Sequence, residues 1–148
     1  MPAELPASAR LLMAFDHAKV RWLLIGRQAL IHYGAPVQTM DYDVWADPDP
    51  ENVRRLVEVA QHAGFFDSMG DWVASRRELL TIYKEPQKMD IFLIPVFTNL
   101  DGELIDFAQA YPRRVVVNME GDPFHPSLPD LEDLRRLKRM RDTEKDRE

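Results

Sequence analysis

The chain has 148 residues, with 19 basic and 25 acidic side chains, so its formal net charge at pH 7 is −6. This length fits one domain spanning 1–148, and 45% hydrophobic with 30% charged residues is the balance of a globular chain. The absence of cysteine excludes a disulfide framework and a thiolate metal site. The acidic balance argues against broad nucleic-acid binding. The longest apolar run, Ile91 to Phe97, is shorter than the about 20 residues of a membrane span, so we expect a cytoplasmic protein without a membrane partner.

Apolar spacing in the first half of the chain predicts helices that alternate with buried strands. The helices are expected at 7–19, 27–33 and 50–63, and the strands at 20–25 and 40–46. Gly26 ends the first strand, and Gly34 ends the helix after it. Asp49 is expected to cap the third helix, with Pro50 as its first residue.

The second half predicts two strands at 78–84 and 88–95 joined by a turn, a helix at 104–111 and a strand at 114–119. A capping box at 127–130 predicts a last helix over about 128–142, and the polar tail 143–148 is expected to fray. The order of elements predicts an α+β domain, in which helices pack on a mixed β-sheet of about four or five strands.

The most informative local pattern is the pair Asp41 and Asp43. On a strand, residues two apart point to the same side, about 6.6–7 Å from each other. Two carboxylates at this spacing repel, and a divalent cation removes that cost. Mg²⁺ accepts one or two carboxylates, and two such ions about 3.5–4 Å apart can clamp a phosphoryl transfer. The alternative is that both side chains simply face solvent on a half-exposed sheet.

Two further features stand beside this pair. The strand, glycine turn and helix around Gly26 would present free backbone N–H groups to a phosphate, because glycine lets the phosphate approach the backbone. Asp90 opens an otherwise apolar strand. As a third carboxylate it would be a metal ligand or a general base for an attacking hydroxyl, and otherwise it is a polar strand end facing water.

The order of these features resembles the minimal nucleotidyltransferases of the DNA polymerase beta superfamily. Gly26, Asp41, Asp43 and Asp90 match the family pattern, and 16–46, 88–95 and 127–146 are similar to a bacterial group that includes abortive-infection toxins. The resemblance implies a nucleotidyltransferase-like fold and transfer of a nucleoside monophosphate from an NTP to a hydroxyl acceptor. It also implies Mg²⁺ or Mn²⁺ at the three aspartates, and ATP among the candidate donors.

The resemblance further implies a set of residues that contact the nucleotide: Gly26, Arg27, Gln28, Thr39, Lys138 and Arg141. Arg27 departs from the family, which has a small residue there. An arginine would either block the triphosphate or hold it through its guanidinium group. The acceptor is a tRNA end, a protein hydroxyl or a small molecule, and the sequence does not choose among them. It also leaves open whether the chain forms a homodimer or binds a partner protein.

Two other functions compete with catalysis by this family. One is an inactive member of the same fold that binds a nucleotide or a partner protein, as in a toxin–antitoxin pair. The other is a glycosyltransferase, in which paired aspartates hold a nucleotide diphosphate through a metal, although such domains usually have a longer chain. Trp45 shares the strand face of Asp41 and Asp43, and we expect it to pack rather than to stack a base.

Overall fold

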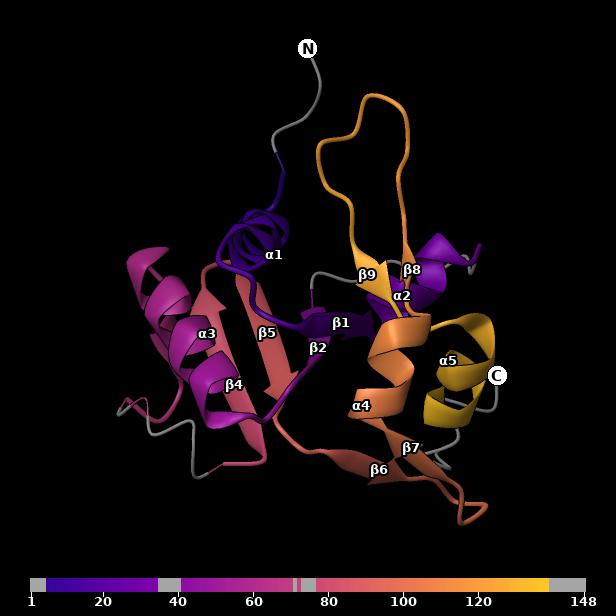
Figure 1. Cartoon of the computed structure of the whole chain (residues 1–148). Helices are drawn as coiled ribbons and strands as arrows, with labels where there is room; N and C mark the ends of the chain where they lie inside the picture. The colour runs from indigo at the N-terminus through magenta and orange to yellow at the C-terminus, as the bar shows by residue number, and fades with distance from the viewer. Residues whose placement is uncertain (1–4, 35–40, 71, 73–76, 139–148) are drawn as a thin grey trace.

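The computed structural model describes residues 5–34, 41–70, 72 and 77–138 (Figure 1). Its helices are α1 (Ala7–His17), α2 (Gly26–His32), α3 (Pro50–His62), α4 (Phe107–Ala110), the 3-10 turn η2 (Tyr111–Arg113) and α5 (Leu131–Lys138). Its strands are β1 (Trp22–Ile25), β2 (Asp41–Ala46), β3 (Phe66–Asp67), β4 (Leu79–Lys84), β5 (Gln87–Phe92), β6 (Val96–Thr98), β7 (Leu104–Asp106), β8 (Val115–Val116) and β9 (Ser127–Leu128). The expected mixed α+β architecture is confirmed.

The described strands form a five-stranded sheet in the order β1-β2-β5-β4-β3, with two separate ribbons, β6-β7 and β8-β9. β2 and β5 are parallel, and the other neighbours in the large sheet are antiparallel. A parallel pair needs a long crossover, which here contains α3, β3 and β4. Two strands that are far apart in sequence therefore become direct neighbours.

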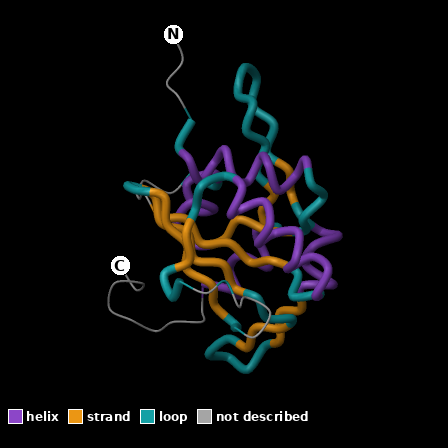
Figure 2. Tube along the Cα trace, turned by 90° about the vertical axis from the view of Figure 1, so that its left-hand side faces the viewer, coloured by secondary structure: helices purple, strands orange, loops and turns teal. Residues whose placement is uncertain are grey.

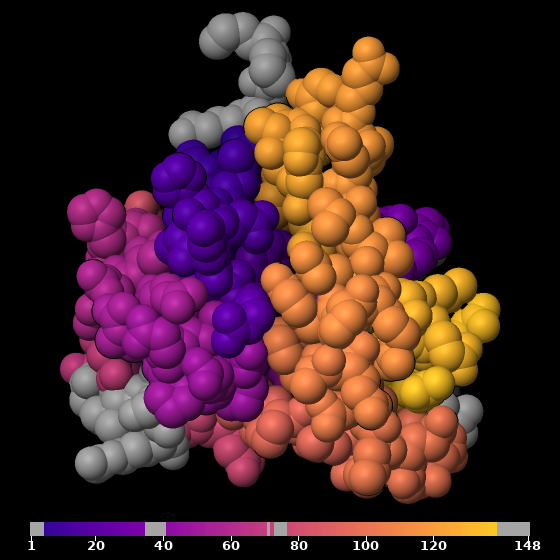
Figure 3. All heavy atoms as spheres, in the orientation of Figure 1, coloured from indigo at the N-terminus to yellow at the C-terminus, as the bar shows by residue number. Residues whose placement is uncertain are grey.

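One face of this sheet carries the main core. Tyr42, Val44 and Ala46 alternate along β2 and are buried with apolar residues of α1 and α3. Figure 1 shows α1 and α3 in front of β4 and β5, and in Figure 3 their indigo and magenta spheres cover the left-hand part of the view. In Figure 2, turned by 90°, most helices lie to the right of the strands. The helices therefore shield mainly one face.

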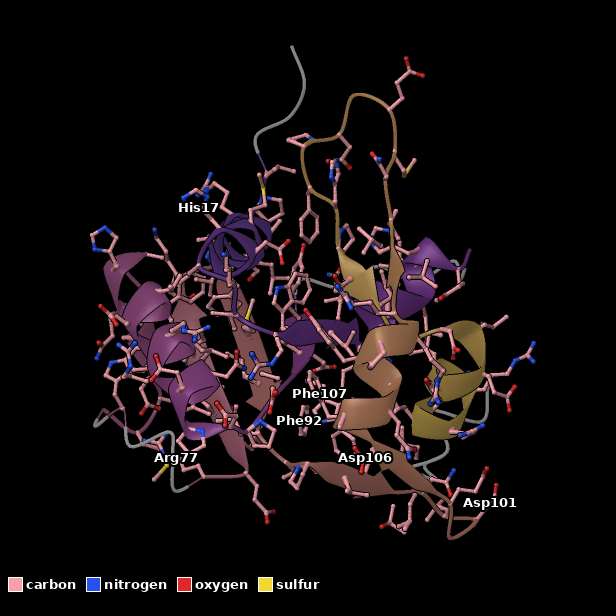
Figure 4. The ribbon with its side chains drawn as sticks, in the orientation of Figure 1. His17, Arg77, Phe92, Asp101, Asp106 and Phe107 are labelled. Carbon is pink, nitrogen blue, oxygen red and sulfur yellow. The ribbon has the colours of Figure 1, made fainter. Side chains whose placement is uncertain are left out.

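The opposite face is covered at one end by a smaller core built around Trp45. Its ring lies 4.8 Å from that of Phe97 and 5.2 Å from that of Phe107, and its Nε1 donates to the Ile94 carbonyl at 2.8 Å. Phe92 packs against the same cluster, and Figure 4 shows it close to Phe107. Trp45 is therefore a packing residue, as expected. Asp41 and Asp43 lie farther along the same strand face, outside this cluster.

The side chain of Asp67 in the edge strand β3 is fully buried and holds the strand in place through hydrogen bonds. Arg77 donates to both carboxylate oxygens, at 2.8 and 2.6 Å, and the backbone N–H groups of Met69 and Trp72 donate to it at 3.1 and 2.8 Å. The Arg77 hydrogen bond is the main cause that holds the pKa of Asp67 well below its usual range. This carboxylate ties β3 to the turn that follows it.

The expected helix over 104–111 is confirmed only at Phe107–Ala110 and is wrong for its first three residues. Leu104 to Asp106 form β7 and pair with β6. The Asp106 side chain accepts from the Ala108 backbone N–H at 2.7 Å, so it caps a helix that begins only at Phe107. The strand expected at 114–119 is shorter and consists only of β8. The two-residue strand β3 was not predicted.

The last helix begins at Leu131, not near residue 128. Ser127 and Leu128 pair with β8 instead, since a residue that precedes proline favours an extended backbone. Asp130 is the cap, because its Oδ1 accepts from the Asp133 N–H at 2.8 Å. The expected helix end near residue 142 and the tail 143–148 lie outside the described residues. Over the described part of the chain, no helix combines the length and the apolar character needed to cross a bilayer.

Candidate active site

The sheet register brings the three predicted carboxylates to one face of two neighbouring strands. In the parallel pair, Asp43 of β2 is opposite Asp90 of β5, and Asp41 is opposite Lys88. Asp41 and Asp43 alternate with the buried Tyr42 and therefore point away from the main core. Asp41 is exposed, and Asp43 and Asp90 are half-buried. The side chains lie where solvent, and a ligand dissolved in it, can reach them.

Asp90 is already held by two neighbours. Thr81 Oγ1 on β4 donates to Asp90 Oδ1 at 2.6 Å. Lys88 Nζ lies 3.7 Å from Asp90 Oδ2, with 38% of the lysine side chain and 22% of the aspartate side chain exposed. The hydroxyl orients the carboxylate, and the ammonium group balances its charge. Neither Thr81 nor Lys88 was singled out from the sequence, although Lys88 is two residues from Asp90 and must share its face.

A cluster of three or more His, Cys, Asp or Glu side chains that could hold a metal ion does not occur among the described residues. Two of the acids thus lie on β2 and the third lies on the neighbouring β5, and together they do not surround a metal site. This donor set still suits Mg²⁺, which usually takes one or two carboxylates and completes its shell with water and substrate phosphates. A metal that arrives with a nucleotide would need no cage made by the protein alone.

Gly26 lies directly against Asp43. Its φ is +69°, in the left-handed region, and a Cβ added there would overlap Asp43 Oδ2. The cause is the antiparallel register of β1 and β2, which places Ile25 opposite Asp43 just before α2 begins. Both the backbone conformation and the close approach of the carboxylate require glycine at this turn.

We expect Gly26→Ala to lose about 2–4 kcal/mol of unfolding free energy and to displace Asp43. Gly102→Ala is the matched control, because its φ is +80° but a Cβ added there would meet nothing within 4 Å. The control should lose only the backbone cost of about 1–2 kcal/mol. Urea denaturation measures both variants, and equal losses would show that the collision with Asp43 does not matter.

The predicted nucleotide contacts that the structure describes, besides Gly26, lie on two different helices. Arg27 and Gln28 are half-buried in the first turn of α2, next to Gly26. Lys138 is exposed at the last residue of α5. Thr39 and Arg141 lie outside the described residues. Arg27 and Gln28 directly follow Gly26, which lies against Asp43 of the carboxylate site.

The mixed sheet and the helices packed on it have a nucleotidyltransferase fold. Two solved structures share it. TM1012 from Thermotoga maritima, which carries a nucleotidyltransferase assignment, aligns with a TM-score of 0.60 and 17% identity over 91% of this chain and 84% of its own. The lincosamide antibiotic adenylyltransferase LnuA, solved with lincomycin bound, aligns with a TM-score of 0.64 and 18% identity over 95% of this chain and 90% of its own. No family model and no curated protein sequence matches the chain.

Proposed function

We propose that this protein transfers a nucleoside monophosphate from an NTP to a hydroxyl acceptor, in a reaction that depends on Mg²⁺ or Mn²⁺. The observation that carries the proposal is the pairing of Asp43 with Asp90 across two parallel strands, with Asp41 on the same face. The shared fold of TM1012 and LnuA adds support, since both names denote nucleotidyl transfer.

In this proposal Asp41 and Asp43 hold the metal ion together with the phosphates of the nucleotide. The bound cation would neutralise negative charge that builds up on the phosphates during transfer. Asp90 either joins them as a ligand or accepts a proton from the attacking hydroxyl. Its hydrogen bond from Thr81 fixes the carboxylate in either role, because one oxygen is held while the other faces Lys88.

The NTP phosphates are proposed to bind at the backbone turn formed by Gly26, Arg27 and Gln28. Arg27 adds a guanidinium group that can donate two parallel hydrogen bonds to phosphate oxygens. From the family resemblance, Lys138 and Arg141 are proposed as further phosphate contacts and Thr39 as a further nucleotide contact.

The reaction itself is a displacement at the α-phosphorus. The acceptor oxygen forms a bond to this phosphorus, the bond to the bridging oxygen of pyrophosphate breaks, and the hydroxyl proton passes to a carboxylate. The protein contributes position and charge rather than a covalent intermediate.

A second function is favoured by one observation. The ion pair of Lys88 with Asp90 places a fixed positive charge beside the acids. In an inactive member of the fold, such a charge would take part of the role of a cation, and the protein would bind a nucleotide or a partner protein, as in a toxin–antitoxin pair, without turnover.

The two functions differ in whether pyrophosphate is released. The wild-type protein is incubated with each Mg-NTP and a panel of hydroxylated acceptors, including tRNA, a protein extract and small molecules. Pyrophosphate that appears only when metal and acceptor are both present supports nucleotidyl transfer. Calorimetric binding of an NTP without any pyrophosphate favours the inactive binding module. Absence of NTP binding contradicts nucleotidyl transfer and a nucleotide-binding module, and leaves only the binding of a partner protein.

A further inference from the structure

The open face of the sheet carries a pair of aromatic rings beyond the carboxylates. Asp41 is opposite Lys88, Lys88 is opposite Tyr83, and Tyr83 is opposite Phe66, so one line of side chains crosses β2, β5, β4 and β3. Neighbouring strands are about 4.8 Å apart, which puts Tyr83 about 10 Å and Phe66 about 14 Å from β2. The acids and the rings therefore belong to one continuous surface.

The two rings stack on each other to form a platform in which Phe66 is exposed and Tyr83 is half-buried. Their centroids lie 5.8 Å apart at an interplanar angle of 26°, and 53% of Phe66 is exposed. Neither ring belongs to the core clusters that the described residues form. The buried ion pair of Asp67 with Arg77 fixes the backbone of the strand that presents Phe66. A flat ring of a ligand can stack on such a pre-positioned pair without the cost of ordering it.

The strand order separates this platform from the glycine turn. β1 and Gly26 lie on one side of the β2-β5 pair, whereas β4 and β3 lie on the other side. In an in-line displacement the attacking oxygen approaches the phosphorus opposite the leaving group. If the NTP phosphates occupy the Gly26 side, the acceptor must approach from the side of Tyr83 and Phe66.

We propose that Phe66 and Tyr83 form the acceptor subsite, and that the acceptor is a small hydroxylated molecule with a flat aromatic ring. Its orientation toward the acids rests on the proposed nucleotidyl transfer. Lys88 lies between the rings and Asp41, so the linker between the ring and the hydroxyl would pass along it. The net charge of −6 disfavours a long nucleic acid as the acceptor.

The test compares two alcohols that differ only in ring flatness, 2-phenylethanol and 2-cyclohexylethanol. In NMR titrations the wild type should bind the aromatic alcohol about 2–10-fold more tightly, with shifts at the Phe66 and Tyr83 ring signals. Phe66→Leu keeps an apolar side chain but removes the flat ring, so the preference should disappear. Leu104→Ala, at a side chain with 67% exposure on β7, is the control and should retain it. Equal binding of both alcohols, or a preference that survives in Phe66→Leu, would overturn the ring subsite.

Calorimetry with Mg-ATP on the same proteins separates this inference from the proposed function. Phe66→Leu should bind Mg-ATP as the wild type does, because the ring lies on the acceptor side. If the rings bind 2-phenylethanol but the wild type binds no NTP, the ring site stands and its assignment to an acceptor fails. If Mg-ATP binds and is turned over but the aromatic alcohol leaves both ring signals unmoved, the proposed function stands and the subsite fails.

Discussion

Asp43→Asn should reduce nucleotidyl transfer by about 100-fold to 1000-fold, a loss similar to that caused by removing one group that stabilises transition-state charge. Asp43 is the acid that links the parts of the site, since it is opposite Asp90 and in contact with the Gly26 turn. Asparagine keeps the shape of the side chain and removes its charge. The loss should therefore appear in kcat and in the metal dependence of the rate, while the fold is retained.

The measurement is pyrophosphate release at several Mg²⁺ concentrations, combined with thermal unfolding. Asp101→Asn is the matched control, because it makes the same chemical change at an exposed position in the turn between β6 and β7, a ribbon separate from the sheet that carries the acids; Figure 4 shows Asp101 at the lower right of the view. A control that loses as much activity, or an Asp43→Asn protein that transfers nucleotides at the wild-type rate, would contradict the role assigned to Asp43.

Asp67→Asn should lower the free energy of unfolding by about 3–5 kcal/mol, because it leaves the charge of Arg77 in a mostly buried position without its partner. Only 15% of the Arg77 side chain is exposed, and none of the Asp67 side chain. Removing the exposed ion pair by Glu58→Gln is the control, since Arg54 and Glu58 expose 59% and 71% of their side chains. That change should cost less than about 1 kcal/mol.

The same carboxylate predicts a pH dependence of stability. Because the pKa of Asp67 is lower in the folded than in the unfolded protein, its stabilising contribution is complete above the unfolded pKa of about 3.9. The contribution is lost as the pH falls from there toward the folded pKa. Urea denaturation between pH 6 and pH 2 measures the free energy of unfolding of the wild type and of Asp67→Asn. The difference between these two free energies should become smaller as the pH falls. A constant difference would contradict the assignment.

The local parts of the fold could be predicted because their signals lie within a few residues. Asp49 and Pro50 define the start of α3, and the Asp49 side chain does accept from the Asn52 N–H, at 3.3 Å. Alternation along β2 correctly put Asp41 and Asp43 on the face opposite the buried Tyr42. Caps and period-two patterns need no knowledge of distant neighbours.

Features that depend on pairing between distant strands could not be predicted in the same way. The register that sets Asp43 beside Asp90 joins strands separated by α3, β3 and β4, and nothing in either sequence segment specifies it. Phe66 lies in a strand of two residues, too short for any periodicity. The ring pair depends on the pairing of β3 with β4, which a two-residue strand does not reveal in the sequence.

The central claim is that Asp41 and Asp43, with Asp90 beside them, hold a divalent cation together with a nucleotide. The most direct test is a crystal structure with Mn²⁺ and a non-hydrolysable ATP analogue, in which anomalous scattering locates the metal. We expect a manganese peak about 2–2.3 Å from carboxylate oxygens of Asp41 and Asp43 and from a phosphate oxygen of the analogue. An analogue bound elsewhere, or a nucleotide seated at Gly26 with no metal peak beside these carboxylates, would contradict it.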